Sequence, residues 1–475
     1  MSQRLTGSED RPLRVAVVGS GPSAFYAIEA LFKVEGLHCS CDVFDRLPTP
    51  YGLVRGGVAP DHQNIKAVVR IYEKIAADPR FRFFGNVTVG RDLSVDELQA
   101  LYDCVIWAIG NESDRALGIP GDDLDGVHSA TAFVGWYNCH PDHQTHRFRL
   151  EDAQRVVVVG NGNVAMDVTR VLVSDPDELA KTDISQAAVE VLRRSSLREV
   201  VLLGRRGGAQ AAFSTKEIEE LSRVQGVDLV VPPDEVDEDP VTTAWLAGDA
   251  PRAAQRNWKF LREQAGHGEG RAPRKVRTIF RASPVEVLGR DGRVVGLRAL
   301  RNELRADADG VPRPVATDES FTIDCEVVLA AIGYRGVPVP GLPFCERRGV
   351  VPNDEGRVLR DADGGEVLPG HYVVGWAKRG PTGLIGTNSP DSKATVAAIV
   401  EDLASATSST LPDVDPQRIV DLLRQRDIDF VSYEDWLALD TWEQIEGRRL
   451  GKVRHKPASI RELLEVIAVL RRGPE

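Results

Sequence analysis

The chain has 475 residues, more than one hydrophobic core usually supports, so two domains are expected. Its net charge of -12 disfavours a nucleic-acid partner or an anionic membrane surface, and no apolar run is long enough to span a bilayer. The short polar N-terminus carries no signal-peptide pattern, which makes the cytoplasm the expected location.

The cysteines and a histidine run are the first candidates for metal or redox chemistry. The six cysteines fall at positions 39, 41, 104, 139, 325 and 345 and include no C-x-x-C pair, so neither a redox dithiol nor a zinc ribbon is predicted. We expect them to be small buried side chains. His140, His143 and His146 form an H-x-x-H-x-x-H run, but Pro141 and Asp142 interrupt any helix there. No metal site is predicted.

The first elements in chain order predict a dinucleotide site. A strand at residues 14–18 leads into a glycine turn containing Gly19, Gly21 and Ser23, and then into a helix at 25–33. Such a turn lets the backbone approach a pyrophosphate at a helix N-terminus. The next strand ends on Asp45, whose carboxylate suits ribose hydroxyls and would repel a 2′-phosphate. This site therefore favours an unphosphorylated ribose, as in FAD.

The same pattern returns in the middle of the chain. A strand at residues 155–159 is followed by a turn with Gly162, Asn163, Val164 and Ala165, and by a helix at 166–173. The following strand, at 200–203, ends close to Arg205 and Arg206. Two guanidinium groups at the position of the ribose acid favour a 2′-phosphate and hence NADP(H). Two such units predict an α/β fold with two Rossmann-like dinucleotide-binding domains.

An internal repeat indicates how these domains are connected. Residues 102–110 and 325–333 are both apolar strands ending in Ala-Ile-Gly, which fits the strands by which a chain leaves one domain and re-enters it. We expect an NADP domain inserted into an FAD domain, as in glutathione reductase-like flavoproteins. The expected parts are 12–113 and 331–475 for the FAD domain, with a helical C-terminal tail ending near Arg472, and 114–330 for the NADP(H) domain.

Three polar segments are expected to be irregular. Residues 232–240 and 303–320 are acidic, contain proline and are rich in turn formers, so they are predicted to be surface loops of the inserted domain. A Ser/Thr/Asp/Pro stretch at 405–416 is predicted to lead into the tail.

Four longer motifs carry a family resemblance. They are residues 47–55 (LPTPYGLVR), 57–62 (GVAPDH), 204–207 (GRRG) and 375–388 (GWAKRGPTGLIGTN). With them the chain resembles the adrenodoxin reductase-like ferredoxin-NADP(+) reductases, including their bacterial members, from about Arg14 to the C-terminal tail. The resemblance implies FAD and NADP(H) as cofactors, hydride transfer from NADPH to FAD, and one-electron transfer to a ferredoxin-type iron-sulfur protein. A monomer or weak dimer is expected.

The resemblance also implies site residues. FAD is held in that family at positions matching Ser23, Asp45, Leu53, Val89, Trp376, Gly383, Leu384 and Ile385. NADP(H) contacts match Arg115, Gly162, Asn163, Val164, Ala165, Arg205, Arg206, Glu217 and Gly383. His62 and Glu217 match polar residues that line the stacking site of nicotinamide and flavin, where they orient the carboxamide or handle protons.

The chain departs from the family pattern at two positions. Asp45 is shorter than the glutamate common there, although it keeps the acceptor. Glu219 stands where family members carry an arginine linked to ferredoxin docking, which leaves the identity of the electron acceptor open.

Three other functions compete with ferredoxin reduction. A diaphorase-like flavoprotein would use another acceptor. A glutamate synthase-like subunit should carry an N-terminal cysteine cluster, which this sequence does not have. A non-catalytic NADP(H)-binding scaffold would keep both folds and transfer no electrons.

Overall fold

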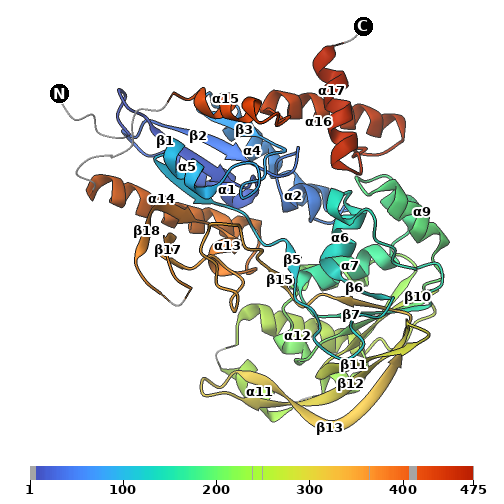
Figure 1. The fold of residues 1–475 in the computed structure, drawn as a ribbon. Helices are drawn as coiled ribbons and strands as arrows, with labels where there is room; N and C mark the ends of the chain where they lie inside the picture. The colour runs from blue at the N-terminus through green and yellow to red at the C-terminus, as the bar shows by residue number, and fades with distance from the viewer. Residues whose placement is uncertain (1–6, 238, 249, 363, 406–414, 474–475) are drawn as a thin grey trace.

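The computed structural model describes residues 7–237, 239–248, 250–362, 364–405 and 415–473. The N-terminal and C-terminal parts of the chain together form a first unit around a seven-stranded sheet (Figure 1). Its strand order is β16-β17-β18-β4-β1-β2-β3. The strands are β1 (Leu13–Val18), β2 (Cys39–Phe44), β3 (Phe81–Phe84), β4 (Cys104–Trp107), β16 (Asn353–Asp354), β17 (Arg357–Leu359) and β18 (Val367–Val373). The five strands from β18 to β3 pair in parallel, whereas β16 and β17 add an antiparallel edge.

Helices cover both faces of this sheet, which explains why all six residues of β1 are buried. Val15 and Val17 face a core formed with α1 (Pro22–Phe32), α4 (Val69–Ala76) and α14 (Asn388–Ser405). Ala16 and Val18 face the opposite core. The remaining helices around this sheet are α2 (Leu53–Gly56), α3 (Gln63–Lys66), α5 (Val95–Leu101), α13 (Trp376–Arg379), α15 (Arg418–Gln425), α16 (Tyr433–Arg449) and α17 (Ile460–Arg472).

The middle of the chain forms a second unit of three layers. Its six-stranded sheet has the order β6-β14-β7-β8-β10-β9, and every pairing in it is parallel. The strands are β6 (Val127–Ser129), β7 (Arg155–Val159), β8 (Glu199–Leu203), β9 (Val227–Val230), β10 (Arg274–Ile279) and β14 (Val327–Ala330). An antiparallel sheet of β11 (Ala282–Arg290), β12 (Arg293–Ala306) and β13 (Pro312–Asp324) packs on one face.

Helices lie on the other face of this second sheet. They are α6 (Ala130–Tyr137), α7 (Asn163–Val173), α8 (Pro176–Leu179), α9 (Gln186–Arg194), α10 (Thr215–Ser222) and α12 (Arg252–Ala265). A further helix, α11 (Pro240–Ala247), contacts β12 and β13 instead. Valines alternate between the two faces of β7: Val156 and Val158 point to the helices, and Val157 and Val159 to β11–β13. The predicted fold class, with one Rossmann-like unit inserted into another, is confirmed.

Both connections between the units run side by side. The outgoing segment β5 (Ser113–Asp114) pairs antiparallel with the returning segment β15 (Tyr334–Arg335). The two strands of the Ala-Ile-Gly repeat precede these segments directly: β4 belongs to the first sheet and β14 to the second.

The prediction of a surface loop at residues 303–320 is wrong. These residues form most of a hairpin, in which Ala306 pairs with Pro312 and Leu300 with Ser320. Its strands expose one face to solvent, so polar residues fill that face and hide the strand pattern. Residues 232–240 include the short 3₁₀ helix η3 (Pro233–Val236), but Glu235 within it is buried and accepts hydrogen bonds from Arg301 and the Phe280 backbone N–H. Of the stretch at 405–416, positions 406–414 lie outside the described residues.

The C-terminal tail contacts both units through the buried carboxylate of Asp183. Asp183, before α9, accepts from Lys66 Nζ at 2.6 and 2.9 Å and lies 2.8 Å from Lys456 Nζ. Lys66 belongs to α3 of the first unit and Lys456 to the tail. Val453 N–H also donates to Lys181 O at 3.0 Å. The tail thus fixes the inserted unit against the first one.

The cysteine prediction is confirmed, since all six are free and buried. Among the described residues, no helix is both long and apolar enough to cross a membrane.

Candidate functional site

The first glycine turn is shaped by its neighbours. Gly19 has φ +95°, and a Cβ there would collide with Ala108 O at the end of β4. A Cβ on Gly21 would meet nothing within 4 Å, so the backbone of this turn faces open space. Gly21 is also the N-cap of α1, and because Pro22 at the first helical position has no N–H, Ser23 supplies the first backbone N–H of the helix. The turn therefore has the room and the donors that a pyrophosphate requires.

Asp45 lies directly against this turn. Its carboxylate accepts from Ser20 N–H at 3.0 Å, from the Ser20 hydroxyl, and from Leu47 N–H at 2.9 Å. Burial raises the pKa of Asp45, and the hydrogen bonds from Ser20 and Leu47 partly lower it again. The structure thus brings Asp45 to the glycine turn, at the carboxyl edge of the sheet, as a positioned acceptor.

The second glycine turn repeats the first. Gly160 has φ +134°, and a Cβ there would collide with Ala331 O beyond β14, while a Cβ on Gly162 would meet nothing within 4 Å. Asn163 begins α7, and its side-chain oxygen accepts from Ser214 N–H at 2.8 Å. The Ala-Ile-Gly repeat therefore has a structural role that its sequence alone did not disclose. The alanine carbonyl of each copy lies against one glycine turn, just after a strand that pairs in parallel with the strand before that turn.

Val164 and Ala165 follow in the first turn of α7 and face inward. Ala165 is buried in the helical core and Val164 packs against it.

The arginine pair stands just beyond β8. Arg205 is exposed and Arg206 half-buried, and neither forms an ion pair with an acid among the described residues. Burial lowers the pKa of Arg206, and the charges of Arg205 and Arg313 lower it further. Uncompensated positive charge of this kind is suited to a phosphate. Arg115, just after β5, is exposed, and its backbone N–H donates to Gly333 O at 3.2 Å.

The apolar and glycine residues assigned to the flavin come from three segments. A Cβ on Gly52 would lie 3.1 Å from Gly21 Cα, so the chain at Leu53 runs against the first glycine turn. Val89 is buried in the core beside β3. The buried backbone of Gly375, before Trp376, approaches Ser23 so closely that a Cβ would come 2.5 Å from its hydroxyl.

Trp376 and the loop after it lie toward the inserted unit. The Trp376 indole N–H donates to Thr382 O at 3.2 Å, and its ring lies 5.2 Å from that of Tyr334 in β15. Gly383 has φ +84° and is exposed, and Leu384 is 64% exposed while Ile385 is half-buried. This loop offers free backbone and apolar surface to a bound molecule.

His62 and Glu217 meet across the boundary between the units. His62 precedes α3 of the first unit, and Glu217 lies on α10 of the second. His62 Nε2 is 3.9 Å from Glu217 Oε2. Burial raises the pKa of Glu217, and the negative charge of Asp167 raises it further. The family resemblance pairs these residues, and the structure brings them together.

Four charged residues that the sequence patterns did not reveal complete this cluster. Arg170 on α7 donates to Asp61 at 2.6 and 3.1 Å, to Asp167 at 2.6 Å and to Glu217 at 3.2 Å. Glu220 lies 3.1 Å from His62 Nε2. The sequence does place Asp167 with Arg170, and Glu217 with Glu220, three residues apart on helices, which indicates that each pair shares one helix face. This spacing does not indicate which residues of the first unit these side chains contact.

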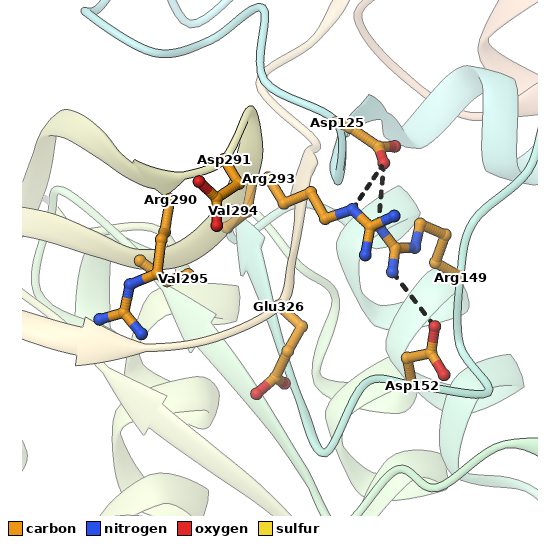
Figure 2. A pocket seen from close by; sticks show the side chains of 9 residues that line it. All are labelled: Asp125, Arg149, Asp152, Arg290, Asp291, Arg293, Val294, Val295 and Glu326. Atoms are coloured by element: carbon orange, nitrogen blue, oxygen red, sulfur yellow. Dashed lines mark hydrogen bonds and ion pairs between the residues drawn. The ribbon is translucent and has the colours of Figure 1, made fainter.

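Two other features lie apart from these residues. The pocket in Figure 2 is lined by Asp125, Arg149, Asp152, Arg290, Asp291, Arg293, Val294, Val295 and Glu326 and encloses about 420 Å³. Its charges are largely used within the protein: Arg149 pairs with Asp125 and Asp152, and Glu326 accepts two backbone N–H groups. It contains no residue assigned to either nucleotide. In the histidine run neighbouring rings lie tilted against each other, with centroids 5.2 and 5.6 Å apart, and burial lowers the pKa of His140 to about 4.

Known proteins of closely similar sequence and structure are reductases. The NADPH-ferredoxin reductase FprA of Mycobacterium tuberculosis is 44% identical over 464 residues, covering 96% of this chain and 99% of that protein. The mitochondrial NADPH:adrenodoxin oxidoreductase of Arabidopsis thaliana is 39% identical over 485 residues, covering 98% of both chains. A solved structure of M. tuberculosis FprA in complex with NADPH superimposes with a TM-score of 0.90 at 43% identity, covering 96% of this chain and 100% of that one.

No protein-family model matches the sequence. The relatives decide the assignment, because they match over nearly their whole length and at high identity. This chain belongs to the family of NADPH-ferredoxin and NADPH:adrenodoxin reductases.

Proposed function

We propose that this protein takes hydride from NADPH onto FAD and passes the electrons singly to a ferredoxin-type iron-sulfur protein. One observation carries the proposal: two glycine turns of the same geometry differ in the side chains beside them, an acceptor at Asp45 and paired cations at Arg205 and Arg206. A relative with the same fold has been solved with NADPH. Bound flavin supplies the conversion from a two-electron donor to one-electron steps.

The residues of the first unit would hold FAD. Gly19, Gly21 and the start of α1 with Ser23 would bind the pyrophosphate, and Asp45 would accept from the ribose hydroxyls. Leu53, Val89 and Trp376 would wall the cofactor. Main-chain N–H groups from Gly383 to Ile385, in the exposed loop, would donate to the edge of the isoalloxazine ring. The open space beside Gly21 in the first glycine turn fits the pyrophosphate of such a dinucleotide.

The residues of the inserted unit would hold NADPH. The turn from Gly162 to Ala165 would bind its pyrophosphate, and Arg205 and Arg206, with Arg115, would bind phosphate oxygens. Gly383 has no side chain to obstruct nicotinamide, so the two rings can stack. His62 and Glu217 would orient the carboxamide, and burial raises the pKa of the Glu217 carboxyl. The protein thus contributes mainly position and charge.

The parts and the partner of the protein belong to the same proposal. The boundaries 12–113, 114–330 and 331–475 are supported by the membership of the two sheets, and by the paired segments β5 and β15. Glu219 is half-buried and pairs only with Arg223 among the described residues, so the usual docking cation is replaced by an acid. The acceptor would therefore be a ferredoxin-type protein with less acidic surface opposite Glu219. A cytoplasmic monomer or weak dimer is proposed.

A spectroscopic experiment tests this function. The purified protein is expected to be yellow, and its flavin should bleach anaerobically with NADPH much faster than with NADH. It should then reduce cytochrome c only when a ferredoxin is added. A colourless protein that takes up no FAD would support a scaffold instead. Bleaching without ferredoxin-dependent turnover would indicate a different acceptor, as in a diaphorase.

A further inference from the structure

The cluster between the two units has the donor set of a metal site. His62 Nε2, Glu217 and Glu220 place one ligand atom each within 4.8 Å of one another. His62 Nε2 lies 3.1 Å from Glu220 Oε2 and 3.9 Å from Glu217 Oε2. In a tetrahedral zinc site with bonds of about 2.0 to 2.1 Å, neighbouring ligand atoms stand about 3.3 Å apart. The three atoms therefore need only small movements to share an ion.

The ring of His62 is oriented for such a role. Its Nδ1 faces the ion pair of Asp167 and Arg170, with Asp167 Oδ1 at 3.6 Å and Arg170 Nη2 at 3.5 Å. Nε2 is therefore the nitrogen directed at the two glutamates. The usual support of a zinc-bound histidine is a carboxylate that accepts from the second ring nitrogen, and Asp167 Oδ1, at 3.6 Å from Nδ1, lies just beyond hydrogen-bond distance of it.

The charge of the cluster also favours a cation. Four carboxylates, those of Asp61, Asp167, Glu217 and Glu220, stand against the two cations Arg170 and Lys216. These carboxylates exceed the two cations by two negative charges, and Arg170 and its three carboxylate partners are largely screened from water. A divalent ion would neutralise the remaining charge.

We infer that His62, Glu217 and Glu220 form a Zn²⁺ site that bridges the two units and, when occupied, blocks entry of the nicotinamide. One imidazole and two carboxylates suit Zn²⁺ better than Mg²⁺, which prefers oxygen ligands and keeps its water. The site is inhibitory because it uses His62 and Glu217, which makes that part of the inference rest on the proposed function. Binding of the ion itself does not depend on it.

Calorimetric titration of the flavin-loaded protein with Zn²⁺ in a non-chelating neutral buffer tests the site. Wild-type protein should bind one Zn²⁺ per chain, and Mg²⁺ should not compete. Glu220→Gln removes one ligand and should weaken binding about tenfold or more. Glu219→Gln is the matched control, since it makes the same charge change on the same helix at a half-buried side chain whose carboxylate pairs with Arg223. His146→Gln controls for binding at the exposed end of the histidine run.

The same samples test inhibition. Zn²⁺ should slow anaerobic flavin reduction by NADPH in wild type and in the two control variants, and about tenfold more Zn²⁺ should be needed in Glu220→Gln. The inference is overturned by unchanged affinity in Glu220→Gln, by loss of binding in His146→Gln, or by bound Zn²⁺ that leaves the reduction rate unaltered. Failure of the proposed function is seen separately, as absent reduction by NADPH in metal-free protein.

Discussion

Replacing Arg205 and Arg206 together with Ala should abolish most of the preference for NADPH. Each charge-assisted hydrogen bond contributes about 1.5 to 3 kcal/mol, so losing both should raise the KM for NADPH on the order of 100-fold or more. The value of kcat at saturation should change little, because the 2′-phosphate is remote from the reacting carbon and its binding is equal in ground and transition states. Steady-state kinetics with NADPH and NADH measures both.

The structure supplies the control for this experiment. Arg298 is a half-exposed arginine of the inserted unit that is already paired, 2.6 Å from Glu286. Arg298→Ala should leave the ratio of the two coenzymes as in wild type. NADH use should be unaffected in the double variant, since NADH has no 2′-phosphate. If the double variant kept the wild-type preference, the second glycine turn would not be the NADPH site.

Asp183→Asn should destabilise the protein by about 3 to 5 kcal/mol, the usual cost of removing one partner of a buried ion pair. The change leaves the ammonium groups of Lys66 and Lys456 without their carboxylate. Burial already lowers the pKa of Lys66 to about 7, against the opposing influence of Asp183. Without Asp183, the Lys66 ammonium must either stay charged in the interior or release its proton. Each unit by which its pKa falls below the solution value corresponds to about 1.4 kcal/mol of lost stability.

Thermal unfolding, followed by circular dichroism and by release of flavin fluorescence, checks this prediction. The variant should unfold several degrees below wild type. Asp177→Asn is the matched control, because Asp177 lies in the same region and pairs with Arg193 at the surface, where both side chains are largely exposed. Its midpoint should stay close to that of wild type, since exposed pairs contribute little. Equal unfolding temperatures for the two variants would contradict a stabilising role of the Asp183 ion pairs.

Local patterns predicted the parts of the fold that depend on neighbours in sequence. The glycine turns at Gly19 and Gly160 were recognisable because only glycine tolerates a positive φ against a carbonyl oxygen. Asp45 and the arginine pair were recognisable because the end of the second strand has a fixed distance from the turn. The same logic failed at residues 303–320, where a strand exposed on one face resembles a polar loop.

Such local patterns did not predict the contacts between the two units. Glu220 reaches His62, and Asp183 reaches Lys456, across sequence separations of 158 and more residues, and no spacing rule encodes them. They arise only once the inserted unit has been placed against the first one. The family resemblance identified His62 and Glu217 but gave no reason to consider Arg170, whose guanidinium organises three carboxylates around them.

The pairing of β5 with β15 gives the inserted unit a particular kind of independence. Because the outgoing and returning strands are hydrogen-bonded neighbours, the chain enters and leaves the inserted unit through segments that lie about 5 Å apart. A coenzyme module whose ends meet at one place can be exchanged as a cassette without stretching the protein that hosts it, much as domain insertions are tolerated where termini lie close together. Evolution, or an engineer, could therefore alter the electron donor of this enzyme by replacing one module while leaving the flavin chemistry intact.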